Sequence, residues 1–282
     1  MLSLIPTPIG NLKDVTLRSL EVLSSCAVLL CEDVRVTKRL LFLLEQEDWV
    51  QSVLKEKQKS LRQKRFLSFH SHNQEEFLKS VEPCFFTNQH VGFVSDAGMP
   101  CVSDPGASLV RFAQEHGVSY EVLPGPSACV SAYGASGFEV TEFHFVGFLP
   151  PKSAARRAKI ASLMNSLGAL VIYESPKRLL DTLGDLALMC PEGILFATKE
   201  MSKLHACHFK GTILEVSTQL QSVPSKTLQG EWVLVCLLPQ QEMPSLSLRD
   251  IEEMDLPPKI KAKLLGKLKG IPPKILYAQG LA

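Results

Sequence analysis

A strand that ends in a loop with two Ser-Asp pairs is the feature of this chain that most restricts its fold. Residues 95–106 read Ser-Asp-Ala-Gly-Met-Pro-Cys-Val-Ser-Asp-Pro-Gly, and they follow the apolar run at 91–94. The apolar residues after Ala107 have the spacing of a helix. Glycine and proline hold such a loop in turns and let a ligand approach the backbone. The loop therefore predicts either a binding site for a polar small molecule at the carboxyl edge of a sheet or an ordinary turn before a capped helix.

Short apolar runs alternate with helix-like stretches over the first half of the chain. We expect strands at 2–5, 27–31, 66–69, 91–94 and 121–123, with helices near 17–23, 37–44, 73–81 and after 107. This alternation is typical of an α/β domain with a largely parallel sheet.

The second half is organised differently. We expect strands at 143–148, 169–173, 194–198, 211–215 and 232–237, with helices at 153–167 and 176–189. Because the later strands follow one another without long helices, a mixed sheet with antiparallel pairing is predicted. Pro-rich segments and a basic helix at 257–269 come last. The predicted division is an N-terminal α/β domain at 1–138, a second α+β domain at 139–238 and a small basic helical tail at 239–282.

Local charge is more informative than net charge here. The 282 residues are 45% apolar and 21% charged with a net charge of +1, which fits a globular protein of one large or two ordinary domains. Three segments are nevertheless basic, at 55–65, at 152–159 and over the last 26 residues. Each can be a solvated face, but together they indicate a polyanionic partner.

The cysteines and the chain start bear on the compartment. None of the eight cysteines forms a Cys-x-x-Cys pair, and most lie in apolar runs, as buried reduced thiols do. The first residues lack the basic segment and cleavage site of a signal peptide. No apolar run approaches the ~20 residues that a membrane span needs. We therefore expect a cytoplasmic protein with no membrane partner.

Four loops with ligand-type residues follow strands of the first half, at 6–11, 32–35, 95–106 and 124–128. In one parallel sheet such loops meet at one edge, where they would form a single crevice. The second half adds loops at 147–150, 173–178, 198–200 and 230–232. A ligand clamped between the two domains would explain both sets.

Other site types fit less well. The chain lacks the Gly-x-Gly-x-x-Gly fingerprint after its first strand, the phosphate loop and the Gly-x-Ser-x-Gly elbow. His70 with His72, and His205 with His208, have no nearby set of cysteines or carboxylates, so no metal site is predicted. Ser127 follows a proline and has no evident histidine partner, which makes it a poor nucleophile candidate.

In their order along the chain, these loops resemble the tetrapyrrole-methylase-like (class III) S-adenosylmethionine-dependent methyltransferases. Within that superfamily they look closest to the bacterial 16S ribosomal RNA (cytidine-2'-O)-methyltransferases. The resemblance covers roughly residues 1–237. Its matching stretches are Pro6–Leu12, Asp14–Arg18, Glu32–Arg35, Lys38–Leu41, Phe93–Pro100, Val102–Gly106, Pro124–Ala128, Gly147–Pro150, Tyr173–Pro176 with Arg178, Lys199–Glu200 with Lys203–His205, and Gly230–Glu231. Three features depart from that pattern: Val34 stands where threonine is usual, Lys177 where histidine is frequent, and the loop at 45–65 is longer.

The resemblance implies a two-domain fold with S-adenosylmethionine in the cleft between the domains. The residues that it places against the cofactor are Pro8, Ser95, Asp96, Ala97, Gly98, Val102, Ser103, Ser127, Ala128, Glu174, Ser175, Thr198 and Lys199. Candidates for the catalytic neighbourhood, where a ribose hydroxyl must lose its proton, are Asp33, Arg35 and Glu200. The alternative for Asp33 and Arg35 is an ion pair that locks their loop.

The implied partner is 16S ribosomal RNA or the small ribosomal subunit. Phosphate contacts would come from Lys152, Arg156, Arg157, Lys177 and Arg178, and the long loop at 50–65 and the tail would extend that surface. A homodimer is implied by analogy with the superfamily. Two alternatives stay open: a methylase for a tetrapyrrole or another small molecule, and a non-catalytic RNA-binding protein on the same fold.

Overall fold

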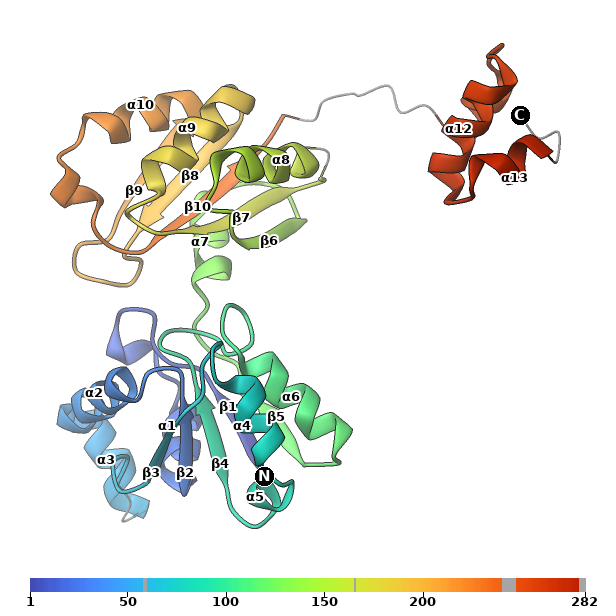
Figure 1. Ribbon diagram of the computed structural model, residues 1–282. Coiled ribbons are helices and arrows are strands. Elements are labelled where there is room, and N and C mark those ends of the chain that lie inside the picture. The colour runs from blue at the N-terminus through green and yellow to red at the C-terminus, as the bar shows by residue number, and fades with distance from the viewer. Residues whose placement is uncertain (58–59, 165, 240–246, 279–282) are drawn as a thin grey trace. The chain divides into compact units, whose positions relative to one another are not determined.

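Two five-stranded sheets form the larger of the two units into which the chain divides, Met1–Pro239, and the smaller unit is Gln240–Ala282 (Figure 1). The computed structural model describes residues 1–57, 60–164, 166–239 and 247–278. Within these residues no helix has the length and apolar character that crossing a membrane requires.

The first sheet has the strand order β3-β2-β4-β1-β5, and all of its strand pairs are parallel, which confirms the predicted parallel sheet. Its strands are β1 (Leu2–Ile5), β2 (Val28–Cys31), β3 (Arg65–Ser68), β4 (Val91–Val94) and β5 (Tyr120–Val122). The strands β1, β2 and β4 are buried along their whole length, as expected for continuous apolar runs covered on both faces.

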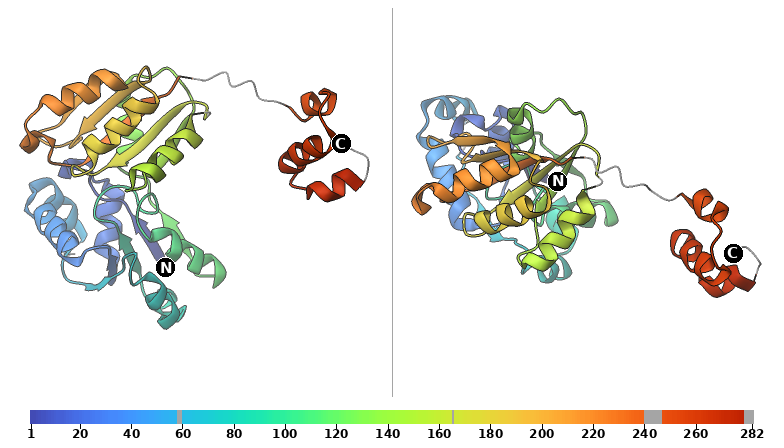
Figure 2. Two further views of the ribbon diagram at one scale, coloured as in Figure 1. Left: turned by 45° about the horizontal axis from the view of Figure 1, so that its top comes forward. Right: turned by 90° about the horizontal axis from the view of Figure 1, so that it is seen from above.

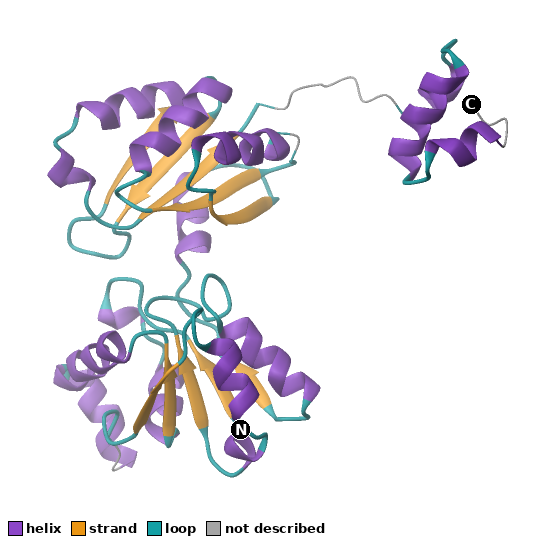
Figure 3. Cartoon of the chain, viewed as in Figure 1, coloured by secondary structure: helices purple, strands orange, loops and turns teal. Residues whose placement is uncertain are grey.

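Helices cover both faces of this sheet (Figure 3). One face packs against α1 (Leu17–Ser25), α2 (Val34–Gln46) and α3 (Asp48–Lys57). The other face packs against α4 (Gln74–Ser80), α5 (Cys84–Thr87) and α6 (Gly106–Glu115). A short 3-10 turn, η1 (Leu12–Asp14), precedes α1. The prediction of a long loop at 50–65 is wrong for residues 50–57, because they belong to α3. Residues 58–59 lie outside the described chain.

The loops after β1 and β4 diverge although these two strands are neighbours. The chain leaves β1 toward α1 on one face of the sheet and leaves β4 toward α6 on the other. Such a switch point opens a crevice at the carboxyl ends of the strands, where open α/β sheets bind ligands. A two-residue bridge joins the loops just beyond their strands, with Thr7 N donating to Gly98 O (3.0 Å) and Gly98 N to Thr7 O (3.1 Å).

The second sheet is mixed, as predicted, with the order β6-β7-β10-β8-β9 and one parallel pair, β6 with β7. Its strands are β6 (Phe143–Phe148), β7 (Ala169–Glu174), β8 (Ile194–Lys199), β9 (Cys207–Thr212) and β10 (Trp232–Leu237). Figure 2 shows α8 (Ser153–Leu163), α9 (Leu179–Met189) and α10 (Ile213–Ser222) side by side over one face. The other face packs against α7 (Ala128–Ser136), and η2 (Ser225–Leu228) precedes β10.

The strand predicted at 211–215 is wrong. The strand β9 ends at Thr212, and α10 begins at Ile213. Thr212 Oγ1 accepts a hydrogen bond from Glu215 N (3.2 Å), and the Glu215 carboxylate accepts one from Thr212 N (2.8 Å). This capping box is a helix-start signal, because it satisfies two amide donors that a helix leaves free. A helix therefore separates β9 from β10, contrary to the expected run of strands.

Within its described residues, 247–278, the smaller unit contains three helices, α11 (Leu248–Glu253), α12 (Pro258–Lys269) and α13 (Pro273–Ala278). They surround a core of Ile251, Ala262, Leu265 and Leu276. Its α12 matches the predicted basic helix, whereas residues 240–246 and 279–282 of the predicted tail lie outside the described chain. The division at 138 stays a prediction. The helix α7, which lies before residue 138, packs on the second sheet rather than on the first.

Candidate active site

A cavity of about 290 Å³ lies where the loops of the first sheet meet the second sheet. Both halves of the larger unit contribute to its wall, as a ligand clamped between them requires. The residues that line it are Ile9, Glu32, Ser95, Ala97, Gly98, Met99, Val102, Ser103, Asp104, Ser127, Ala128, Phe148, Tyr173, Glu174, Ser175, Pro176, Thr198, Glu200, Met201, Glu231, Trp232 and Val233.

The structure brings most of the predicted cofactor residues to this cavity. They arrive from two directions, since one group follows β4 and β5 and the other lies at the ends of β7 and β8. The predicted residues in the wall are Ser95, Ala97, Gly98, Val102, Ser103, Ser127, Ala128, Glu174, Ser175 and Thr198.

Three predicted cofactor residues do not line the cavity. Pro8 is buried in the loop, and its neighbour Ile9 takes the place in the wall. Lys199 is buried, and its Nζ donates to Thr227 O (2.7 Å). It faces away from the cavity because Thr198 faces the cavity and successive residues of a strand point to opposite faces. Asp96 is exposed beside the cavity, where its Oδ1 accepts from Asp33 N (3.0 Å).

The loop at 95–106 is held by its own polar groups. Ser95 Oγ donates to Gly98 O (3.3 Å), and Thr7 Oγ1 donates to Ser95 O (3.3 Å). Asp104 Oδ1 accepts from Cys101 N (3.0 Å) and Gly106 N (2.8 Å). Gly98 adopts a φ of +82°, a left-handed conformation that glycine takes without strain. These hydrogen bonds tie the loop to itself and to the loop after β1, and Ser95, Ala97–Met99 and Val102–Asp104 line the cavity.

Asp104 is a wall residue that the sequence reading missed. It belongs to the second Ser-Asp pair, whose serine was selected while its aspartate was not. Burial raises the pKa of the Asp104 carboxyl, and the two amides that donate to it act in the opposite direction. The repetition of the Ser-Asp pair was the signal that could have identified it.

Aromatic side chains at the ends of β6 and β7 form another part of the wall that was missed. Phe148 and Tyr173 contact each other edge to face, with ring centroids 5.9 Å apart. The Tyr173 hydroxyl accepts from Cys129 N (3.1 Å), which ties α7 to the second sheet. Burial raises the pKa of Tyr173, so it stays protonated near neutral pH. Both positions lie in stretches that match the family, 147–150 and 173–176, but they were not among the predicted site residues, because aromatic residues at strand ends are ordinary core residues in a sequence.

Glu200 is the predicted catalytic residue that reaches the cavity. Its Oε1 accepts from Glu231 N (2.9 Å) and from Lys203 Nζ (3.0 Å), and Lys203 Nζ also contacts Glu231 Oε2 (3.0 Å). Partial burial acts to raise the pKa of Glu200, but the Glu231 amide and the Lys203 ammonium bring it below its usual value. Burial likewise acts to lower the pKa of Lys203, and the two carboxylates raise it overall.

The backbone around this network is unusual. Glu200 and Ser202 have φ values of +52° and +66°, which non-glycine residues rarely adopt. Gly10 packs against this turn so closely that a Cβ there would lie 2.9 Å from Met201 O. Ser202 Oγ donates to Asp14 Oδ2 (2.7 Å). These contacts hold the Glu200 turn against the loop after β1, so both halves of the wall are fixed together.

Asp33 and Arg35 do not line the cavity. They form an ion pair with each other, which was the alternative left open by the sequence. Arg35 Nη2 contacts Asp33 Oδ2 (2.6 Å), and Asp33 Oδ1 caps α2 by accepting from Arg35 N (2.7 Å). Hydrogen bonds from the Arg35 side chain and backbone lower the pKa of Asp33 to about 2. The pair therefore locks its loop. Glu32, which precedes it, is the residue of this loop that reaches the cavity.

Replacement of Arg35 by alanine is expected to move the pKa of Asp33 from about 2 toward the ordinary ~3.9. A carboxyl with a depressed pKa stabilises the fold above the unfolded-state pKa and loses this effect as pH falls to the folded-state pKa. The window for Asp33 is therefore between about pH 4 and pH 2. Carboxyl NMR titration of both proteins measures the shift, and an Asp33 that still titrates near pH 2 in Arg35→Ala would show that the arginine is not its cause.

The predicted phosphate-binding residues divide into two groups. Lys152, Arg157 and Lys177 are exposed, and Arg157 Nε lies 3.9 Å from Asp185 Oδ1. Arg156 does not fit the prediction, because it is buried and its Nε donates to Asp185 Oδ2 (2.7 Å) while its Nη1 donates to Pro151 O (3.1 Å).

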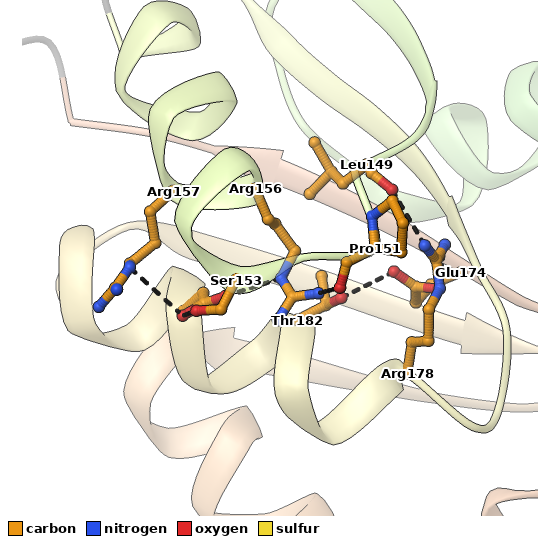
Figure 4. Close-up of polar contacts among 9 residues, drawn as sticks. Leu149, Pro151, Ser153, Arg156, Arg157, Glu174, Arg178 and Thr182 are labelled. Atoms are coloured by element: carbon orange, nitrogen blue, oxygen red, sulfur yellow. Dashed lines mark hydrogen bonds and ion pairs between the residues drawn. The ribbon is translucent and has the colours of Figure 1, made fainter.

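Arg178 also points inward, as Figure 4 shows. Its Nε donates to Glu174 Oε1 (2.9 Å), its Nη2 lies 2.7 Å from the same oxygen, and its Nη1 donates to Leu149 O (3.1 Å). The Glu174 side chain is 0% exposed, and its Oε2 also accepts from Thr182 Oγ1 (2.7 Å). Arg178 therefore joins the loops after β6 and β7, and its assignment to RNA contact is replaced by a role in holding the cavity wall.

Among the residues that the structure describes, no group of three or more His, Cys, Asp or Glu side chains is arranged to hold a metal ion. The His70 and His72 rings contact each other with centroids 5.9 Å apart.

Comparison with known proteins gives a consistent picture. Residues 1–216 match the family Tetrapyrrole (Corrin/Porphyrin) Methylases. The chain is 47% identical to the ribosomal RNA small subunit methyltransferase I of Helicobacter pylori strain J99, over all of this chain and 97% of that protein. It is 40% identical to the protein of the same name from Campylobacter fetus subsp. fetus, over 98% of each chain. The solved uroporphyrin-III C-methyl transferase of Thermus thermophilus complexed with S-adenyl homocysteine has a TM-score of 0.53 at 17% identity, over 83% of this chain and 96% of that one, which supports the fold alone.

Proposed function

Since this chain belongs to the tetrapyrrole (corrin/porphyrin) methylase family, we propose that it is a methyltransferase of small-subunit ribosomal RNA. The methyl donor is S-adenosylmethionine. The proposed acceptor is the 2'-hydroxyl of a cytidine in 16S ribosomal RNA. The observation that carries the proposal is the cavity itself, which is built from the loops whose residues carry the family resemblance.

The cavity wall fits the proposed cofactor. Its charged members are Glu32, Asp104, Glu174, Glu200 and Glu231, and none of the described residues that line it is lysine or arginine. Arg178 pairs with Glu174, and Lys203 is shared by Glu200 and Glu231, but no ion pair among the described residues involves Glu32 or Asp104. The wall is therefore acidic overall, which favours a sulfonium cation. Gly98 has no side chain to keep a ligand from the backbone, and a Cβ there would meet Ile9 Cγ2 at 3.2 Å. The residues proposed to hold the cofactor are Ser95, Ala97, Gly98, Val102, Ser103, Ser127, Ala128, Ser175 and Thr198.

When bound, S-adenosylmethionine supplies an activated methyl group, so the protein has mainly to align an oxygen nucleophile with it. Such alignment is worth ~7–11 kcal/mol in well-oriented reactions. We assign Glu200 to the acceptor hydroxyl, because it is the predicted catalytic carboxylate that lines the cavity. Its lowered pKa keeps it ionised but makes it a weaker base, so its proposed role is mainly to orient the hydroxyl. Lys203 and the Glu231 amide would position Glu200.

Mass-spectrometric mapping of small-subunit RNA from a deletion strain and from a complemented strain tests the proposal. We expect one cytidine to lose a ribose methyl group in the deletion strain and to regain it with the wild-type gene. Methyl transfer by purified Glu200→Gln should be slower by ~100-fold or more, whereas Glu115→Gln, an exposed glutamate outside the cavity wall, should match the wild type. Unchanged RNA together with methyl transfer to a tetrapyrrole would establish the alternative instead.

Family membership also supports two secondary proposals, a homodimer and a cytoplasmic location. Light scattering of the purified protein tests the first, and a mass equal to one chain would contradict it. Lys152, Arg157 and Lys177 remain proposed phosphate contacts, since their exposed cations can bind the backbone without reading its sequence.

A further inference from the structure

The helix α12, which Figure 1 labels in the smaller unit, contains a row of exposed lysines. Lys259, Lys263 and Lys267 are all exposed, and each follows the last by four residues. Residues at this spacing lie above one another on a helix, about 6 Å apart along its axis. The buried residues of α12 are Ala262, Leu265 and Gly266, and Ala262 and Leu265 belong to the core of the unit. The row is therefore a continuous basic edge on the outer side of the helix.

These lysines are not used to stabilise the unit. Within residues 247–278, Lys269 pairs with Glu252 (2.8 Å) and Arg249 with Glu253 (2.8 Å), whereas no ion pair involves a lysine of the row. Like charges four residues apart destabilise a helix. Lys259 also lies in the first turn of α12, which contains no acidic residue, and a cation there opposes the helix dipole. The row thus disfavours the isolated helix, so its charge is available for a partner.

The row lies beyond the part of the chain that matches the methylase family, which ends at residue 216. It also lies in the smaller unit, whereas β10, which is likewise beyond residue 216, belongs to the second sheet. We propose that the C-terminal unit binds the phosphate backbone of small-subunit ribosomal RNA through Lys259, Lys263 and Lys267, separately from the cavity that binds the cofactor. This inference rests on the proposed function for its RNA and extends it to a second contact site.

Exposed apolar side chains lie beside the lysine row on α12, and they suggest a different partner. Ile260, Leu264 and Leu268 follow the same spacing and are 50%, 37% and 52% exposed. Such a stripe beside lysines also fits an acidic amphipathic segment of a ribosomal protein. We favour RNA, because an evenly spaced row of unpaired cations complements a polyanion with regularly repeated charges.

Binding of the full-length protein to protein-free small-subunit RNA and to assembled small subunits, measured over a range of salt concentrations, tests the inference. We expect Lys259→Gln/Lys263→Gln/Lys267→Gln to bind both probes ~10–100-fold more weakly at low salt and to reduce the salt slope by roughly 2, at ~0.7 per phosphate contact. Affinity for S-adenosylmethionine should not change. The corresponding triple arginine variant, which keeps the charge, should bind like the wild type.

A matched control removes three other exposed lysines, Lys13→Gln/Lys79→Gln/Lys226→Gln, and should have the smaller effect on both probes. The inference is overturned if the two glutamine variants are equivalent, or if the row variant is impaired only on assembled subunits, which would indicate a protein partner. Circular dichroism checks that the row variant is folded, as its exposed positions lead us to expect. Wild-type protein that binds RNA but methylates none would contradict the proposed function and leave this inference standing.

Discussion

Replacement of Arg178 by methionine is expected to lower the free energy of unfolding by about 3 kcal/mol and to weaken S-adenosylmethionine binding by ~10-fold. The reason is that Glu174 would keep its charge in a fully buried position without the guanidinium that faces it. Removal of one partner of a buried pair typically costs about 3–5 kcal/mol. We place Arg178 at the lower end, because its side chain is 25% exposed and Ser175 N and Thr182 still donate to Glu174.

Cofactor binding weakens in this variant because Arg178 also holds Leu149 O, and with it the loop after β6, against the loop after β7. Urea denaturation and calorimetry measure the two effects. The neighbouring Lys177 supplies the control, since it is exposed and Lys177→Met should change stability by less than about 0.5 kcal/mol. Glu174→Gln combined with Arg178→Met should be more stable than Arg178→Met alone. If Arg178→Met lowered the free energy of unfolding no more than Lys177→Met does, Arg178 would be an ordinary surface cation.

Replacement of Gly98 by alanine is expected to weaken S-adenosylmethionine binding by ~10-fold or more and to lower stability by about 1–2 kcal/mol. The stability loss follows from the φ of +82°, since the left-handed region costs a residue with a Cβ roughly 1–2 kcal/mol. The binding loss has a second cause. The new Cβ would lie 3.2 Å from Ile9 Cγ2, so the bridge between Gly98 and Thr7 must shift at the cavity wall.

Gly117 offers a control that separates these causes. It also has a positive φ, +64°, but a Cβ there would meet nothing within 4 Å, and the residue does not line the cavity. Gly117→Ala should therefore show a similar loss of stability with unchanged cofactor affinity, both measured as for Arg178. Equal cofactor affinities of the two alanine variants would argue against Gly98 as part of the cofactor site.

The location of the cavity could be predicted from the sequence because it depends on strand order. Parallel strands place their carboxyl ends at one edge, so the residues after β1, β2, β4 and β5 had to gather there once those strands were recognised. The capping box at Thr212 and Glu215 shows where this reasoning failed. Its residues gave a valid helix signal, but Gly211 and the apolar residues after it were interpreted as a strand, and α10 was missed.

The two-sheet fold, the family and the loops that build the cavity could be predicted from the chain alone, because they follow from the alternation of apolar runs and from motifs at strand ends. The direction of each side chain, in contrast, became known only from the folded structure. Thr198 and Lys199 are adjacent, yet one lines the cavity and the other is bonded to Thr227 O behind it. Lys177 and Arg178 read alike as basic residues, yet one is exposed and the other pairs with the buried Glu174. The type of a charged residue does not show whether its side chain is exposed or buried. Its surroundings depend on tertiary contacts between residues far apart in the chain.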